Sequence, residues 1–199
     1  MCFSAQASFS ASFVLIAISI LSFCKVRAAR YYVMAATPLL FGMQQAAEGI
    51  LWVALRHPQY AFLQQAALTI FLTFAFGVWP IWEPLSLALI ESRKKRRFTL
   101  KLLTGAGSIL SIFLLSHLYF YGAYAHIAQH HISYTYPMDI PAWTGALILV
   151  LYIFITTSGF FISSIPQVWI VGLALLSAYF ISHYSTIMRW DPYGAFLLH

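Results

Sequence analysis

Charged residues are scarce in this sequence. Only 8% of its 199 residues are Asp, Glu, Lys or Arg, whereas 61% are hydrophobic and 18% are aromatic. A soluble domain carries about 25% charged residues, so this chain lacks the polar side chains that would cover a water-facing surface. The composition therefore excludes a soluble globular protein and predicts an integral membrane protein whose main partner is the lipid bilayer.

Acidic residues and cysteines are few as well. There are 5 Asp and Glu against 11 Lys and Arg, and 2 Cys. Most of the positively charged residues lie in two short runs and are not spread over a broad solvent-exposed surface, which argues against nucleic-acid binding. Two cysteines without a repeated Cys-x-x-Cys pattern exclude a disulfide framework and a ribbon-type zinc site. No glycine-rich phosphate loop occurs, so no nucleotide site is predicted.

Long apolar runs dominate what is present. A run of about 20 apolar residues crosses the roughly 30 Å of hydrocarbon in a bilayer. The runs are continuous and lack strand alternation, so their backbone groups must be satisfied within helices. We expect one all-α transmembrane domain over residues 1–199, with no cleaved signal peptide and a His-containing outer loop at 122–141. The predicted spans are about 7–24, 32–55, 61–82, 99–121, 142–162 and 166–187.

The basic loops predict the orientation. Lys25, Arg27 and Arg30 follow the first span, and the run 93–97 with Lys101 follows the third. Loops rich in Lys and Arg face the cytoplasm, so both termini are expected on the extracytoplasmic side of a bacterial inner (plasma) membrane. The connection at 163–166 carries no charge, and a broken or re-entrant segment there remains an alternative.

The third apolar run is longer than one crossing. It extends to Glu91, and it contains Gly77, Pro80 and Pro84, which should kink or end a helix. We expect a break near the inner interface. Glu83 would then lie at the wet boundary as a helix cap or as a partner of the basic run.

Glu48 is the residue that most favours a functional site. It lies in the second predicted span, roughly 10 Å from the outer end at 1.5 Å per residue. An ionisable group at that depth costs a few kcal/mol unless it is protonated, paired or metal-bound. Gln44, Gln45 and Trp52 share its helix face and predict a polar stripe. The alternative is a protonated carboxyl that hydrogen-bonds neighbouring helices and serves packing only.

The histidines all fall on the predicted outer side. Imidazole and carboxylate groups on separate helices are a recurrent way to build a metal site in a bundle, and His117 and His183 lie at depths compatible with Glu48. A hydrogen-bonded interface histidine is the alternative for each of them. The seven residues are His57, His117, His126, His130, His131, His183 and His199.

Cys2 is the fourth predicted metal ligand. It follows the initiator Met, and a small second residue normally permits removal of that Met. The mature chain would then begin with a free amine and a thiol, a pair that can chelate a metal or act as a nucleophile. Cys24 lies about 33 Å away by helical rise, so the two cannot form a disulfide. An unreactive interfacial cysteine is the alternative.

Further polar residues would surround the metal or replace a ligand. In the outer loop, the His-x-x-x-His spacing of His126 and His130 would place both on one face of a helix as a chelating pair. A wet, pH-responsive loop is the alternative for this segment. The full set is Gln44, Gln45, Trp52, His126, His130 and His131.

Two short motifs resemble a known group of proteins. The chain opens with Met-Cys-Phe-Ser-Ala-Gln-Ala-Ser and carries Gln-x-x-Glu-Gly-x-x-Trp at 45–52. These motifs resemble small uncharacterised bacterial membrane proteins that open with Met-Cys-Phe/Trp-Ser-Ala-x-Ala-Ser and carry a Gln/Glu motif in the second span. The resemblance implies that Cys2 and Glu48 belong to one functional unit, but it supplies no activity. A ceramidase-like amidase is disfavoured because the last span holds a single His183 and no His-x-x-x-His pair.

Three functional hypotheses follow. The first is a transition-metal site of Cys2, Glu48, His117 and His183 in the outer half of the bundle, in a membrane-embedded hydrolase or oxidoreductase. The residue types suit zinc, iron or copper, and the substrate would be a lipid-soluble or small molecule. The second is a small transporter or channel with Glu48 in a polar path. The third is an accessory subunit or oligomer that packs through Ser- and Ala-rich helix faces.

Overall fold

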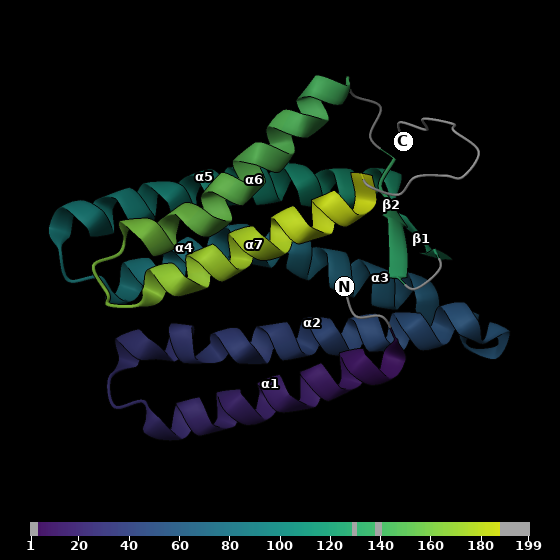
Figure 1. Cartoon of the computed structure of the whole chain (residues 1–199), viewed down its shortest axis with the longest axis horizontal. Helices are drawn as coiled ribbons and strands as arrows, with labels where there is room; N and C mark the ends of the chain where they lie inside the picture. The colour runs from purple at the N-terminus through teal and green to yellow at the C-terminus, as the bar shows by residue number, and fades with distance from the viewer. Residues whose placement is uncertain (1–3, 129–130, 138–140, 188–199) are drawn as a thin grey trace.

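The computed structural model describes residues 4–128, 131–137 and 141–187 (Figure 1). The predicted all-helical architecture is confirmed for these residues, apart from one hairpin of two strands. The helices are α1 (Ala5–Lys25), α2 (Tyr32–Arg56), α3 (Gln64–Thr73), α4 (Trp79–Ile90), α5 (Lys94–Tyr121), α6 (Ala142–Ile162) and α7 (Val168–Ile187), with short helical turns η1 (Ala29–Tyr31), η2 (Pro58–Leu63) and η3 (Phe74–Val78).

Among the described residues, four helical segments are long and apolar enough to cross a membrane: Ala5–Lys25, Pro58–Ile90, Lys94–Tyr121 and Trp143–Ile162. The sequence predicted six. Helix α7 is apolar over Val168–Ile181, which is the part of this helix whose side chains the structure describes. Helix α2 has the length of a span, but it carries Gln44, Gln45 and Glu48, which lower its hydropathy.

Helices α1 and α2 form an antiparallel pair beside a second group made of α3 to α7 (Figure 1). Small residues let the pair approach closely. Ser8 and Ser12 are buried on α1, and the Ser19 hydroxyl donates a hydrogen bond to the Ala35 carbonyl oxygen at 3.0 Å. Ser8 and Ser12 are thus small residues on the buried face of α1, as expected for closely packed helices.

The predicted break in the third apolar run is wrong. The chain stays helical through α3, η3 and α4, and η3 is a single π-helical turn. Neighbouring helices satisfy backbone oxygens in this turn: the Tyr152 hydroxyl of α6 donates to the Ala75 oxygen at 2.7 Å, and the Ser111 hydroxyl of α5 donates to the Gly77 oxygen at 3.0 Å. These tertiary hydrogen bonds allow the helix to continue where its own sequence disfavours it.

The two ends of the bundle differ. The turns α1–α2, α4–α5 and α6–α7 meet at one end (Figure 1), so both basic loops share that end, which we call the basic end. The opposite end carries β1 (Tyr124–Ala128) and β2 (His131–Thr135), paired antiparallel, and we call it the hairpin end. The prediction of a plain loop over 122–141 was therefore incomplete.

Glu91 joins two turns at the basic end. Its side chain is 0% exposed, and its carboxylate accepts hydrogen bonds from the backbone N–H of Ser164 at 2.6 Å and of Arg93 at 2.9 Å. The hydroxyls of Ser163 and Ser164 also donate to it. Burial raises the pKa of this carboxyl, but the hydrogen bonds from Ser164, Arg93 and Ser163 outweigh burial and hold the pKa at about 2.

The connection between α6 and α7 is a short turn at the basic end. The Arg96 guanidinium donates to the Ser163 backbone oxygen at 3.0 Å, in addition to the contacts of Glu91. Gln167 adopts φ 67° just before α7 begins at Val168. Residues 163–166 therefore belong to a short, hydrogen-bonded turn between α6 and α7.

Candidate functional site

The polar stripe on α2 lies in the interior of the bundle. Glu48 is 2% exposed and Trp52 is fully buried. The Gln44 side-chain oxygen accepts a hydrogen bond from the indole N–H of Trp79 on α4 at 2.7 Å. Gln44 thus joins α2 to α4 through Trp79. The Arg56 guanidinium lies 4.9 Å from the centre of a Trp52 ring.

His117 lies at the hairpin end of α5. Its ring stacks on Tyr121 at 4.4 Å and meets Tyr136 at 4.9 Å between centroids. The Tyr136 hydroxyl donates to the Leu114 backbone oxygen at 2.6 Å, which brings the segment after β2 back onto α5. Within the described structure the Nδ1 atom of His117 is buried and has no hydrogen-bond partner.

The loop histidines do not form the predicted helical pair. His126 is exposed on strand β1, opposite Ser133, and His131 begins β2 opposite Ala128. Side chains alternate between the two faces of a strand. The four-residue spacing therefore does not place these histidines on one face of a helix. His130 lies outside the described residues.

The predicted ligand set is only partly described. Glu48 and His117 are in place at the same half of the bundle, Cys2 lies outside the described residues, and so does the side chain of His183 near the end of α7. Among the residues that the structure describes, no three His, Cys, Asp or Glu side chains lie close enough together to hold a metal ion. The metal site therefore stays a prediction.

Glu83 is the residue that the sequence interpretation misplaced. It is 5% exposed within α4 and not at a wet boundary, and no hydrogen bond reaches its carboxylate from any residue in the described part of the chain. The basic run does not pair with it: Arg97 donates to the Glu91 backbone oxygen, and Arg96 to Ser163. The prediction that Glu83 caps a helix or partners the basic run is wrong.

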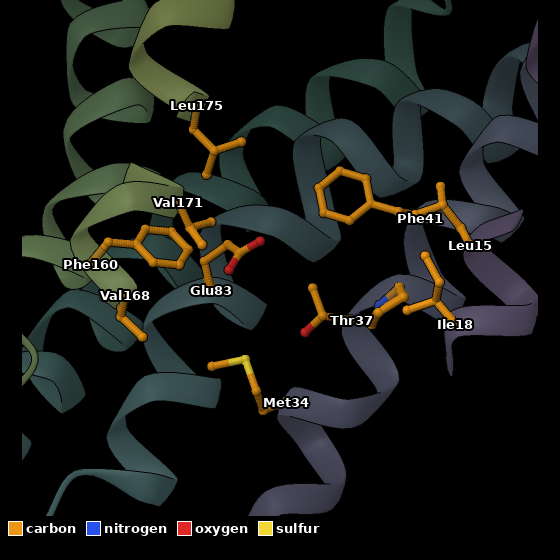
Figure 2. A pocket seen from close by; sticks show the side chains of 11 residues that line it. Leu15, Ile18, Met34, Thr37, Phe41, Glu83, Phe160, Val168, Val171 and Leu175 are labelled. Carbon is orange, nitrogen blue, oxygen red and sulfur yellow. The ribbon is translucent and has the colours of Figure 1, made fainter. Parts of the chain in front are cut away.

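Glu83 faces a cavity of about 300 Å³ between the α1–α2 pair and helices α4, α6 and α7. Figure 2 shows its carboxylate in this space, with Phe160 and Val171 on one side and Phe41 on the other. We call this space the Glu83 cavity. Its lining is otherwise apolar except for one threonine: Leu15, Ile18, Met34, Thr37, Pro38, Phe41, Glu83, Phe160, Val168, Val171 and Leu175.

Two tryptophans of α4 contact the part of α2 that lines this cavity. Phe41 stacks on Trp79 with 3.8 Å between ring centroids, and the Trp82 indole N–H donates to the Thr37 hydroxyl at 3.0 Å. Trp79, Trp82 and Glu83 come from consecutive turns of one helix. The sequence signal that could have located the site is this Trp-x-x-Trp-Glu segment at 79–83, which contains Pro80 and is followed by Pro84.

Two apolar residues of the cavity lining are partly exposed at the surface of the bundle. Ile18 of α1 is 44% exposed and Val171 of α7 is 47% exposed. Ile18 is about 10 Å from Lys25 at the end of α1 by helical rise, a depth inside the hydrocarbon layer of a bilayer if the basic end marks an interface. Such an arrangement can accept an apolar molecule from lipid and offer it one carboxylate.

Comparisons with known proteins supply a family but no activity. No curated protein and no solved structure matches this chain. The family match agrees with the expectation that the chain belongs to an uncharacterised family. The chain belongs to the family of unknown function DUF6629, whose sequence model matches residues 1–186.

Proposed function

We propose that this chain is an integral membrane protein that binds a small lipid-soluble molecule in the Glu83 cavity. The observation that carries the proposal is an apolar cavity with one buried carboxylate, lined in part by exposed apolar residues of α1 and α7. Ligand sites are typically concave and mostly apolar, with few polar groups that fix orientation. The Lys- and Arg-rich end would face the cytoplasm of a bacterial plasma membrane.

The apolar lining favours a ligand that is dissolved in the bilayer. Leu15 and Ile18 of α1 and Val171 of α7 line the cavity, and all three are hydrocarbon side chains that lipid tails would contact. A water-soluble substrate would have to pass these apolar side chains and lose its hydration. A lipid-soluble one enters without that cost.

Photolabelling would test the cavity. An alkylbenzene that carries a diazirine, added to the purified protein in detergent, is expected to label residues such as Phe41 and Val171, as mapped by mass spectrometry of peptides. The Val171→Trp variant fills the cavity from α7, so labelling there should fall at least tenfold.

Val150→Trp is the matched control. Val150 is 62% exposed on α6 and does not line the cavity, so the added indole should leave the labelling unchanged. Labelling spread evenly over exposed apolar residues in both variants, with no excess in the cavity, would contradict the proposal.

A metal site near Glu48 is the second candidate function. The observation that favours it is the buried Nδ1 of His117, which has no hydrogen-bond partner among the described residues, at the same half of the bundle as the buried Glu48. A neutral imidazole nitrogen is a common ligand for zinc, iron and copper. Cys2 and His183 would complete the set, as the motif resemblance implies for Cys2.

Elemental analysis would test this candidate. The protein purified without chelator should contain close to one transition-metal ion per chain, and Glu48→Gln and His117→Ala should each lose most of it. Intact mass would show whether Cys2 is the first residue. Wild-type protein that stays free of metal after reconstitution with zinc, iron and copper would remove the metal from consideration.

A further inference from the structure

We infer that the ligand of the Glu83 cavity is a small organic cation with an aromatic or alkyl body, and that its binding releases one proton from Glu83. This inference rests on the proposed function and specifies its ligand class. The juxtaposition behind it is a lone carboxylate, aromatic rings on two sides of the cavity, and partly exposed apolar residues in its lining.

The charge of Glu83 has no counterpart in the cavity wall. The lining residues in the described structure include no Lys, Arg or His, and the carboxylate accepts no hydrogen bond from described residues. An ionisable side chain in such surroundings is either protonated or paired with a cation. Since the described residues supply no cation here, the partner is a proton or a ligand.

The aromatic walls suit an organic cation. Phe41 from α2 and Phe160 from α6 line the cavity together with Glu83 (Figure 2), and Phe41 is held in place by its stack on Trp79. A cation over an aromatic face is attracted by the electrons of the ring, and the attraction is stronger where water is excluded. A hydrated metal ion would gain little from these walls, whereas an ammonium group with an apolar body contacts both the rings and the carboxylate.

We expect Glu83 to be the group that releases a proton when the cation binds. Within the described part of the chain, Tyr152 from α6 and Tyr179 from α7 interact electrostatically with Glu83. Both are neutral phenols, and the Tyr152 hydroxyl already donates to the Ala75 backbone oxygen. Neither supplies a positive charge to the carboxylate. A bound cation therefore replaces the proton of Glu83 in a ratio of one to one, and the total charge in the cavity stays constant.

A matched pair of probes tests the inference. Benzyltrimethylammonium and neopentylbenzene have the same shape and differ in charge. Used as competitors against diazirine photolabelling at pH 8, the cation should protect the cavity at a concentration at least tenfold lower than the neutral isostere. Glu83→Gln should abolish this preference while the neutral compound still protects.

Proton release gives a readout that does not need a variant. Adding benzyltrimethylammonium to wild-type protein in weakly buffered detergent at a pH where the cavity binds it should release up to one proton per bound cation, and neopentylbenzene should release none. Lowering the pH should weaken binding of the cation alone, up to tenfold per pH unit.

The outcomes separate the two proposals. Equal protection by both probes, or cation binding without proton release at every pH from 5 to 9, overturns the cation inference and leaves a neutral ligand in the cavity. If the diazirine compound does not label the cavity at all, and neither probe therefore has an effect there, the proposed function itself is overturned.

Discussion

Replacing Gly107 with alanine is expected to destabilise the bundle by about 3 kcal/mol or more. A Cβ atom at Gly107 of α5 would lie 1.9 Å from the backbone oxygen of Pro80 on α4 and 2.7 Å from its carbonyl carbon. The Pro80 carbonyl is available for this close approach because Pro84, four residues later, has no N–H to donate. Backbone atoms cannot move aside as a flexible side chain can, so the two helices must separate.

Gly105→Ala is the matched control for this prediction. Gly105 lies two residues away on the same helix, and a Cβ there meets no atom within 4 Å. Alanine at that position should be neutral or should stabilise the helix by about 0.5–1 kcal/mol. Thermal unfolding in detergent, followed by tryptophan fluorescence, would compare both variants with the wild type. Equal stability of the two variants would show that α4 and α5 do not approach this closely.

Glu91→Gln is expected to cost about 3 kcal/mol. The carboxylate accepts hydrogen bonds from two backbone N–H groups, of Arg93 and Ser164, and from the hydroxyls of Ser163 and Ser164. An amide of the same size offers one oxygen and places its NH₂ group against donors. Ser164→Ala removes a single hydroxyl and should cost only about 1 kcal/mol. A loss for Glu91→Gln no larger than that of Ser164→Ala would contradict the role of Glu91 as the link between the two turns.

The same contacts predict a dependence on pH. The pKa of Glu91 in the folded protein is about 2, below its ordinary value of 4.5, so the unfolded chain takes up the proton first as the pH falls. The stabilisation is complete above about pH 4.5 and is lost as the pH falls towards 2. Unfolding measured from pH 6 to pH 3 should show a decline in the wild type that is absent in Glu91→Gln. Parallel curves of stability against pH for the wild type and Glu91→Gln would contradict this prediction.

Composition alone was enough to predict much of the architecture. A chain that is 61% hydrophobic and 8% charged is expected to place its apolar runs in lipid, and continuous apolar runs in lipid are expected to be helices. All six predicted segments appear as helices, although four meet the measure of a membrane span. The grouping of Lys25 and the run 93–97 at one end also followed, because an even number of crossings separates them.

Predictions made from short stretches of sequence failed where neighbouring helices form hydrogen bonds with those stretches. Gly77, Pro80 and Pro84 disfavour a continuous helix when they are read by themselves, yet the chain remains helical because Ser111 and Tyr152 bond to carbonyl groups at the π-helical turn. The strands at 124–128 and 131–135 were missed for a similar reason: Ala125 and Ile132 are buried in a core shared with Trp52, and strand pairing between short segments leaves a weak periodic signal.

The site itself shows the division between sequence and tertiary structure. The sequence by itself determined that Glu48 and Glu83 are carboxylates within apolar helical runs, and hence that each needs a proton, a partner or a ligand. Only the tertiary structure decided which of them faces a cavity. Helix α7, nearly ninety residues from Glu83 along the chain, folds back beside α4 and α6 and closes one wall, and no pattern local to Glu83 carries that information.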